Sequence, residues 1–266
     1  MNNLTTKQYS VINIILYILT LAVNFLGASG YINGMTQKAV SDKYLTLITP
    51  APFTFSIWGL IYVLVIIGLI WLLVKNGEPQ AASMTKVISK LFWLTCIFDI
   101  FWIISFSYEW MLVSVLLIAV FLLSLTRITL AIRNEKDSSL KQFMGLTFGV
   151  FTGWLTIATV VNISAFLVSI GWNGFGISAQ TLAVITLVAA LVVVAYVQSQ
   201  LRNPLVSLTV AWAMLGIYNF LRSADGFGGQ YALLQTAVLI TMGILVLLAV
   251  IRFAVRNKNK IFPATD

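Results

Sequence analysis

Four polar residues lie deep inside long apolar segments, and their side chains have the most chemistry to offer: Asn24, Tyr62, Asp99 and Asn162. Counted from the same end of their segments, each lies roughly 12 to 15 Å inward at about 1.5 Å per helical residue. Unsatisfied polar groups are costly in hydrocarbon, so we expect these four to face inward and to meet at one level of a helical bundle.

Asp99 is the only acid among these four residues. A charge at the centre of a membrane costs about 2.5 to 3.5 kcal/mol, so this carboxyl should be paired, hydrated or protonated. Arg127 is offset from it by roughly 13 Å along the helix axes, which argues against a direct ion pair. Two interpretations follow: a protonatable residue that couples ligand binding to pH, or a structural hydrogen bond between helices.

Aromatic residues surround this polar level. Trp58 and Trp102 lie slightly above it, and Trp154, Ala158 and Asn162 follow one another at intervals of four along a single segment. Flat aromatic walls with a few polar groups suit a planar hydrophobic ligand. They also suit plain helix packing around small residues, and the sequence leaves both interpretations open.

Composition excludes several kinds of catalytic site. The chain contains no histidine, and Cys96 is its single cysteine, which removes the commonest general base and any disulfide framework. No nucleophile, base and orienting group form a recognisable set. We therefore expect no enzyme activity, no cofactor and no metal site.

The elements that must position these residues are membrane-spanning helices. The 266 residues are 60% hydrophobic and only 9% charged, and the mean hydropathy is +0.97, which is typical of an integral membrane protein. The apolar runs are too long and continuous for barrel strands, so the predicted fold class is an all-α, multi-pass bundle of about eight spans. The expected spans are 11 to 33, 53 to 74, 87 to 107, 110 to 132, 145 to 170, 179 to 200, 204 to 222 and 231 to 252.

Basic residues predict the orientation in the membrane. With an even number of spans, every lysine and arginine except Lys38, Lys43 and Arg222 falls on the side of the termini. The excess of Lys and Arg marks the cytoplasmic side, so we expect a cell-membrane protein with both termini cytoplasmic. The positive charge lies in loops and tails, so the expected partner is the lipid bilayer and not nucleic acid.

The segment from 34 to 52 is the longest loop on the opposite side. It carries Tyr44 and ends in Pro50 and Pro52, which suit an entry loop and a first helical turn. Long loops in compact proteins are often functional, so this segment is either a lid that folds back over the bundle or a solvated connector.

The order of these features resembles the translocator protein family, also called the tryptophan-rich sensory proteins (TspO/MBR). The resemblance rests on Ile57-Trp58-x-x-x-Tyr62, Phe98-Asp99-x-x-Trp102 and, most specifically, Trp154-Leu155-x-x-Ala158-x-x-Val161-Asn162. Tyr44 with Leu47 is similar to the Tyr-x-x-Leu of the family's first loop. Asp99 departs from the pattern, because it stands where the family has asparagine.

The resemblance implies a five-helix bundle over roughly residues 11 to 172. We therefore predict a bundle-like domain over 1–172 and three additional helices with a basic tail over 173–266. It also implies a porphyrin or a sterol-like molecule bound inside the bundle under the first loop. The ligand-binding residues expected on this basis are Trp58, Tyr62, Asp99, Trp102, Trp154, Ala158, Asn162, Asn24 and Tyr44.

Three functions fit this sequence. The first is a ligand-binding sensor or carrier of the tryptophan-rich sensory type. The alternative is a proton-coupled secondary transporter of a small substrate that uses Asp99, although no inverted repeat is visible. The third is a membrane subunit whose apolar surface serves a partner protein. A second copy of the chain is a further possible partner, which would make the protein a homodimer.

Overall fold

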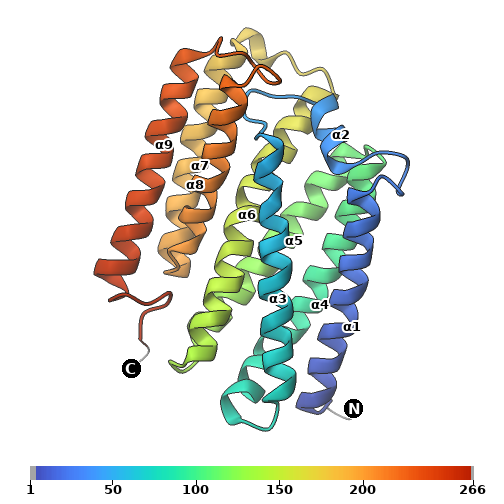
Figure 1. Cartoon of the computed structure of the whole chain (residues 1–266), viewed down its shortest axis with the longest axis vertical. Coiled ribbons are helices and arrows are strands. Elements are labelled where there is room, and N and C mark those ends of the chain that lie inside the picture. Colours follow the sequence, from blue (N-terminus) through green and yellow to red (C-terminus); the bar gives the residue numbers. More distant parts are fainter. Residues whose placement is uncertain (1–3, 265–266) are drawn as a thin grey trace.

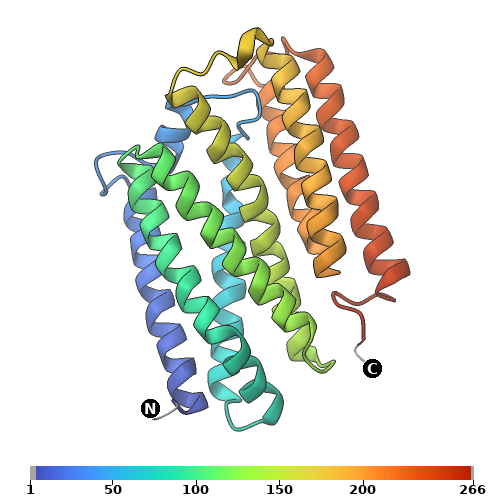
Figure 2. The same ribbon diagram turned by 180° about the vertical axis from the view of Figure 1, so that it is seen from behind.

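Eight long helices run side by side along one axis in the computed structural model, which describes residues 4–264 (Figures 1 and 2). Each is long and apolar enough to cross a membrane. The spanning helices are α1 (Thr6–Ala28), α3 (Ile57–Val74), α4 (Pro79–Ser107), α5 (Met111–Arg133), α6 (Ser139–Ser169), α7 (Ala179–Leu201), α8 (Leu205–Arg222) and α9 (Ala232–Val250). The prediction of an all-α, eight-span bundle is confirmed.

Short elements connect or extend these helices. They are α2 (Gln37–Lys43), η1 (Pro52–Ser56), η2 (Gly174–Gly176) and η3 (Ile251–Arg256). Helix α2 lies across one end of the bundle, and η1 leads directly into α3 (Figure 1).

Three helices, α1, α4 and α6, begin earlier than the sequence indicated. Helix α1 starts at Thr6 because the Thr5 hydroxyl accepts a hydrogen bond from the Gln8 backbone N–H, while the Gln8 side chain accepts one from the Thr5 N–H. Helix α4 starts at Pro79, so Lys86 and Lys90 are exposed residues of a helix rather than of a loop. Their charges lower the local hydropathy but are compatible with helical backbone.

Helix α6 lies between two groups of helices. On one side are α1, α3, α4 and α5, and on the other are α7, α8 and α9 (Figures 1 and 2). Gly153 of α6 permits this contact, because a Cβ atom there would lie 2.6 Å from the Val206 carbonyl oxygen of α8. Whether 1–172 and 173–266 behave as separate domains stays a prediction.

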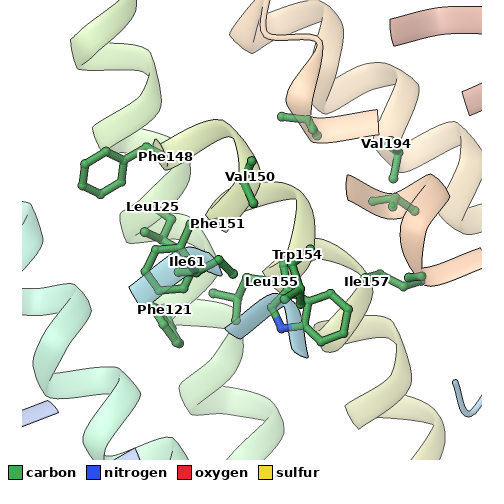
Figure 3. Close-up of a cluster of buried hydrophobic side chains, with 14 of the residues drawn as sticks. Ile61, Phe121, Leu125, Phe148, Val150, Phe151, Trp154, Leu155, Ile157 and Val194 are labelled. Carbon is green, nitrogen blue, oxygen red and sulfur yellow. The ribbon is translucent and has the colours of Figure 1, made fainter. Parts of the chain in front are cut away.

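The core between α3, α5 and α6 is built of large apolar side chains (Figure 3). Ile61, Phe121 and Leu155 are fully buried there, and the Phe121 and Phe151 rings meet edge to face at 5.5 Å. This dense packing fixes the height and rotation of α6 and hence the direction of Trp154.

Both termini lie at the end of the bundle opposite α2 (Figure 1). An even number of spans requires this. The side of the membrane on which they lie stays a prediction.

Candidate ligand-binding site

An internal cavity of about 610 Å³ lies beneath α2, at the end of the bundle remote from the termini. Its walls come from α1, α3, α4, α6 and α8, and α2 and the proline loop cover it. Small-molecule sites are typically about 300 to 1,000 Å³, largely apolar, with a few polar groups. The cavity matches this description in both size and lining.

Trp58 is the centre of the aromatic wall. Its ring lies against those of Tyr62 and Trp102, with centroids 5.8 and 6.2 Å away and ring planes inclined by 29° and 30°. It meets the Phe151 and Trp154 rings edge to face, at 5.9 and 6.2 Å. Helix α3 delivers Trp58 and Tyr62 to this wall together because residues four apart share a helical face.

The first polar group of the cavity links three helices. The Tyr62 hydroxyl of α3 donates to Asn24 Oδ1 at 2.9 Å, and Asn24 Nδ2 of α1 donates to Asp99 Oδ1 of α4 at 3.3 Å. Asn24 and Tyr62 line the cavity, whereas Asp99 lies one hydrogen bond behind them and is 2% exposed. The predicted meeting of these three side chains is present.

Asn162 belongs to a second polar group and not to the first. Its Oδ1 accepts a hydrogen bond from Trp102 Nε1 at 2.9 Å, and its Nδ2 donates to Ser114 Oγ at 2.9 Å. The sequence predicted one cluster because it gives only the depth of each residue in its helix. The rotation of each helix about its axis decides which side chains meet, and it divides the four residues into two clusters.

Trp154 presents an unused donor. It lines the cavity and is 3% exposed, and among residues 4–264 its indole N–H has no hydrogen-bond partner. Figure 3 shows its nitrogen at the edge of the packed core. Buried Trp N–H groups usually find an acceptor, so this donor is left unsatisfied by the described residues.

The loop between α1 and α3 folds back over the cavity as a lid. Thr36 caps α2 by accepting from the Ala39 N–H at 3.0 Å, and Gln37, Lys38 and Ser41 face the cavity with it. Pro50 and Pro52 line the opposite margin. Of the two interpretations of this segment, the structure favours the lid.

Tyr44 lies outside the cavity lining and fastens the lid. Its hydroxyl donates to Glu109 Oε2 at 2.6 Å, and Lys43 Nζ contacts the same oxygen at 2.6 Å. These bonds, first from Lys43 and then from Tyr44, hold the pKa of the Glu109 carboxyl below its ordinary value. The expected direct contact between Tyr44 and a ligand stays a prediction.

Helix α8 completes the site, which the sequence did not indicate. Ala213 and Ile217 line the cavity. The Ala51 N–H donates to the Gly216 carbonyl at 3.0 Å, and Trp212 Nε1 donates to the Thr54 carbonyl at 3.1 Å. Helix α8 therefore holds the proline loop in place through its backbone and one indole.

All of the predicted ligand residues except Asp99 and Tyr44 line the cavity. Lining residues that the predicted set did not contain come from further positions on α1, α4 and α6, and from the lid, the proline loop and α8. The two prolines mark the loop in the sequence, but nothing in the sequence alone identified α8 as its neighbour.

Eight apolar helices among the described residues, five of which line the cavity, define a multi-pass integral membrane protein. A family model described as TSPO-like protein matches residues 10–251, and the chain belongs to this family. The match includes α7 and α8 and most of the last span, beyond the part on which the resemblance rested. Comparison with curated proteins and with solved structures found no match.

Proposed function

We propose that the protein binds a planar hydrophobic ligand, a porphyrin or a sterol-like molecule, in the cavity beneath α2, for sensing or for transport. The observation that carries this proposal is the aromatic wall centred on Trp58, with the Tyr62 and Trp102 rings stacked against it. Stacked and edge-on rings favour a flat π-system over a compact aliphatic molecule. The proposal is for a binding protein and not for an enzyme.

The lid gives the ligand a route that does not require the helices to separate. Helix α2 is seven residues long and is held at two places: Val40 packs in a small buried cluster with Phe106, Met111 and Ala165, and Lys43 and Tyr44 bond to Glu109. A short segment held by so few contacts opens at lower free-energy cost than a spanning helix. We propose that the lid opens for ligand entry and then closes over the bound molecule.

Titration of the purified protein with protoporphyrin in detergent, followed by the porphyrin's own absorbance, tests this function. Saturable binding is expected, weakened severalfold by Trp58→Phe and by Trp154→Phe. Trp71→Phe is the matched control, because Trp71 is on the same helix as Trp58 but packs against Phe143, outside the cavity lining. Unsaturable binding, or equal binding by all four proteins, would refute the proposal.

The second candidate, proton-coupled transport of a small substrate, rests on one different observation. Asp99 is hydrogen-bonded to Asn24, which lines the cavity. A change in the charge of Asp99 would therefore change the electrostatic potential at the cavity wall. Substrate-driven proton movement in vesicles, lost in Asp99→Asn, is the expected result for this function.

A further inference from the structure

Helix α1 has an inverted distribution of side chains. The residues of α1 that are buried, apart from Gly27, are Ser10, Asn13, Tyr17, Thr20 and Asn24. Their spacing of three and four places them on one helical face. Several apolar side chains of α1, such as Ile15 and Ile18, are exposed, and others, such as Ile14 and Leu21, pack at the margins of the polar face. The inward face of this helix therefore carries polar groups along most of its length.

Helix α4 faces this stripe with polar groups of its own, Thr85, Ser89, Thr95 and Asp99, all buried. We call the two sets together the polar seam. Near the terminal end, Asn13 Nδ2 donates to Ser89 Oγ at 2.9 Å and Trp93 Nε1 donates to Asn13 Oδ1 at 2.7 Å. Near the cavity, Asn24 bonds to Asp99. Side-chain hydrogen bonds thus join α1 and α4 near both ends of the seam.

Several hydroxyl groups along the seam have no protein partner. Among residues 4–264, those of Ser10, Tyr17, Thr85 and Thr95 are buried and accept or donate no hydrogen bond. Serine and threonine hydroxyls in helices normally bond to the carbonyl four residues back, as Ser89 does to Thr85 at 2.6 Å. Leaving such a group unsatisfied costs about 1 to 3 kcal/mol, and buried water commonly satisfies groups of this kind.

The seam and the cavity together traverse the bundle. From Ser10 to Asn24 the rise along α1 is roughly 21 Å at about 1.5 Å per residue. Asn24 then lines the cavity, which reaches the lid at the opposite end. Asp99 lies at the junction, and the titratable groups around it are Tyr17, Tyr62 and Cys96. Among the described residues no cation forms an ion pair with Asp99.

We propose that the polar seam conducts protons between the end of the bundle that bears both termini and the cavity, with Asp99 as the site that is protonated on the way. Waters held by the seam hydroxyls carry the proton. A hydronium ion in the seam protonates the Asp99 carboxylate to the carboxylic acid, and a water that enters from the cavity past Asn24 and Tyr62 removes the same proton as hydronium. The step is a proton transfer alone and needs no further reactant. It concerns the proton and does not depend on the identity of a larger ligand.

Proton flux into vesicles tests this proposal in the absence of any other ligand. The full chain is reconstituted in liposomes that contain a pH-indicating dye, and a potassium diffusion potential set with valinomycin drives protons inward. Wild-type vesicles should acidify at least tenfold faster than protein-free vesicles. Asp99→Asn should abolish most of this flux, while its amide still fits beside Asn24.

Two further variants separate conduction from folding. Tyr17→Phe and Thr95→Val each remove a hydroxyl that has no protein partner, so they should reduce the flux severalfold without lowering the melting temperature. Thr241→Val is the matched control on α9, because that buried hydroxyl bonds to its own helix at Ala237 and lies outside the seam. Its flux should equal that of wild type.

The proposal is overturned if wild-type vesicles acidify no faster than protein-free ones. It is also overturned if the flux is unchanged in folded Asp99→Asn, or if Tyr17→Phe and Thr95→Val both conduct as Thr241→Val does. Because no porphyrin is present, these outcomes are independent of the proposed ligand-binding function.

Discussion

Trp58 and Trp154 contribute different things to the cavity. Trp58 is embedded among four other rings, so its contribution is shape and stacking surface. Trp154 also meets Phe55 edge to face at 6.0 Å, yet its N–H has no acceptor within the described part of the chain. In the proposed binding function, Trp58 would supply a flat apolar surface and Trp154 a hydrogen-bond donor.

Trp154→Phe should discriminate between ligands by their hydrogen-bonding chemistry. A ligand with a suitably placed acceptor loses one hydrogen bond, worth about 0.5 to 1.5 kcal/mol, so its affinity should fall by up to roughly tenfold. A flat hydrocarbon such as pyrene should bind both proteins equally. Fluorescence titration with pyrene and absorbance titration with protoporphyrin make the comparison. An equal loss for both ligands would show that the indole contributes only contact area.

At the scale of elements, two short segments decide access to the site. Helix α2 covers the cavity and is tied to the turn between α4 and α5 through Glu109. The η1 turn fixes the opposite margin by its contacts with α8. The first attachment combines an exposed ionic group with the buried cluster around Val40, whereas the second is close-packed and carries no charge. We therefore expect the lid to respond to pH and the proline loop to respond to changes in packing.

The lid should loosen at acidic pH through Glu109. The folded protein lowers the pKa of the Glu109 carboxyl, so the ionised carboxylate stabilises the closed lid fully above the unfolded pKa of about 4.3. This stabilisation is lost as the pH falls through the lower pKa of the folded protein. Ligand release should therefore accelerate below about pH 4. Glu109→Gln should release ligand faster already at pH 7, measured by stopped-flow dissociation. Identical rates for the two proteins at pH 7 would contradict the role of Glu109.

Gly216→Ala should disrupt the junction between α8 and η1. A Cβ atom at this position would lie 1.9 Å from Thr54 Oγ1, so either the loop or the helix must move. Overpacking of this kind typically costs about 1 to 3 kcal/mol. A lower melting temperature together with weaker ligand binding is expected.

Gly243→Ala on α9 is the control for this substitution, since no atom lies within 4 Å of its added Cβ. It should keep both the wild-type melting temperature and the wild-type affinity. Equal behaviour of the two alanine variants would show that the junction tolerates the added methyl group.

At the scale of the whole molecule, the C-terminal tail ties α9 to the beginning of α6. Phe262 is fully buried against Gly145, where a Cβ atom would lie 2.5 Å from the ring. The Phe262 N–H donates to Gln142 Oε1 at 3.0 Å, and Lys260 pairs with Asp137. The tail therefore extends from α9 back to the beginning of α6.

Phe262→Ala should destabilise the whole bundle. Truncating a buried phenylalanine typically costs about 3 to 5 kcal/mol, and here it also removes a contact between distant segments. A clear fall in melting temperature in detergent is expected, whereas Phe253→Ala, at a side chain that is 38% exposed, should have little effect. Equal melting temperatures for the two variants would show that the tail is dispensable.

The sequence predicted the spans well because hydropathy acts along the chain and needs no knowledge of neighbours. It also predicted that Asn24, Tyr62 and Asp99 would meet, since depth in a helix follows from residue number. It placed Asn162 in the same group because depth says nothing about rotation. The roles of α2 and α8 were not predictable, because they depend on which helices pack together. The polar stripe of α1 is visible as a spacing of three and four, but only the structure shows that it faces α4.

The most direct test of the account is to map where a bound porphyrin reacts. Illuminated protoporphyrin oxidises nearby tryptophans, and peptide mass spectrometry identifies the oxidised residues. The account predicts saturable oxidation of Trp58, Trp102 and Trp154, which line the cavity, and little oxidation of Trp71 or Trp110, which do not. Oxidation confined to Trp71 and Trp110, or spread evenly over all of them, would contradict a ligand site beneath α2.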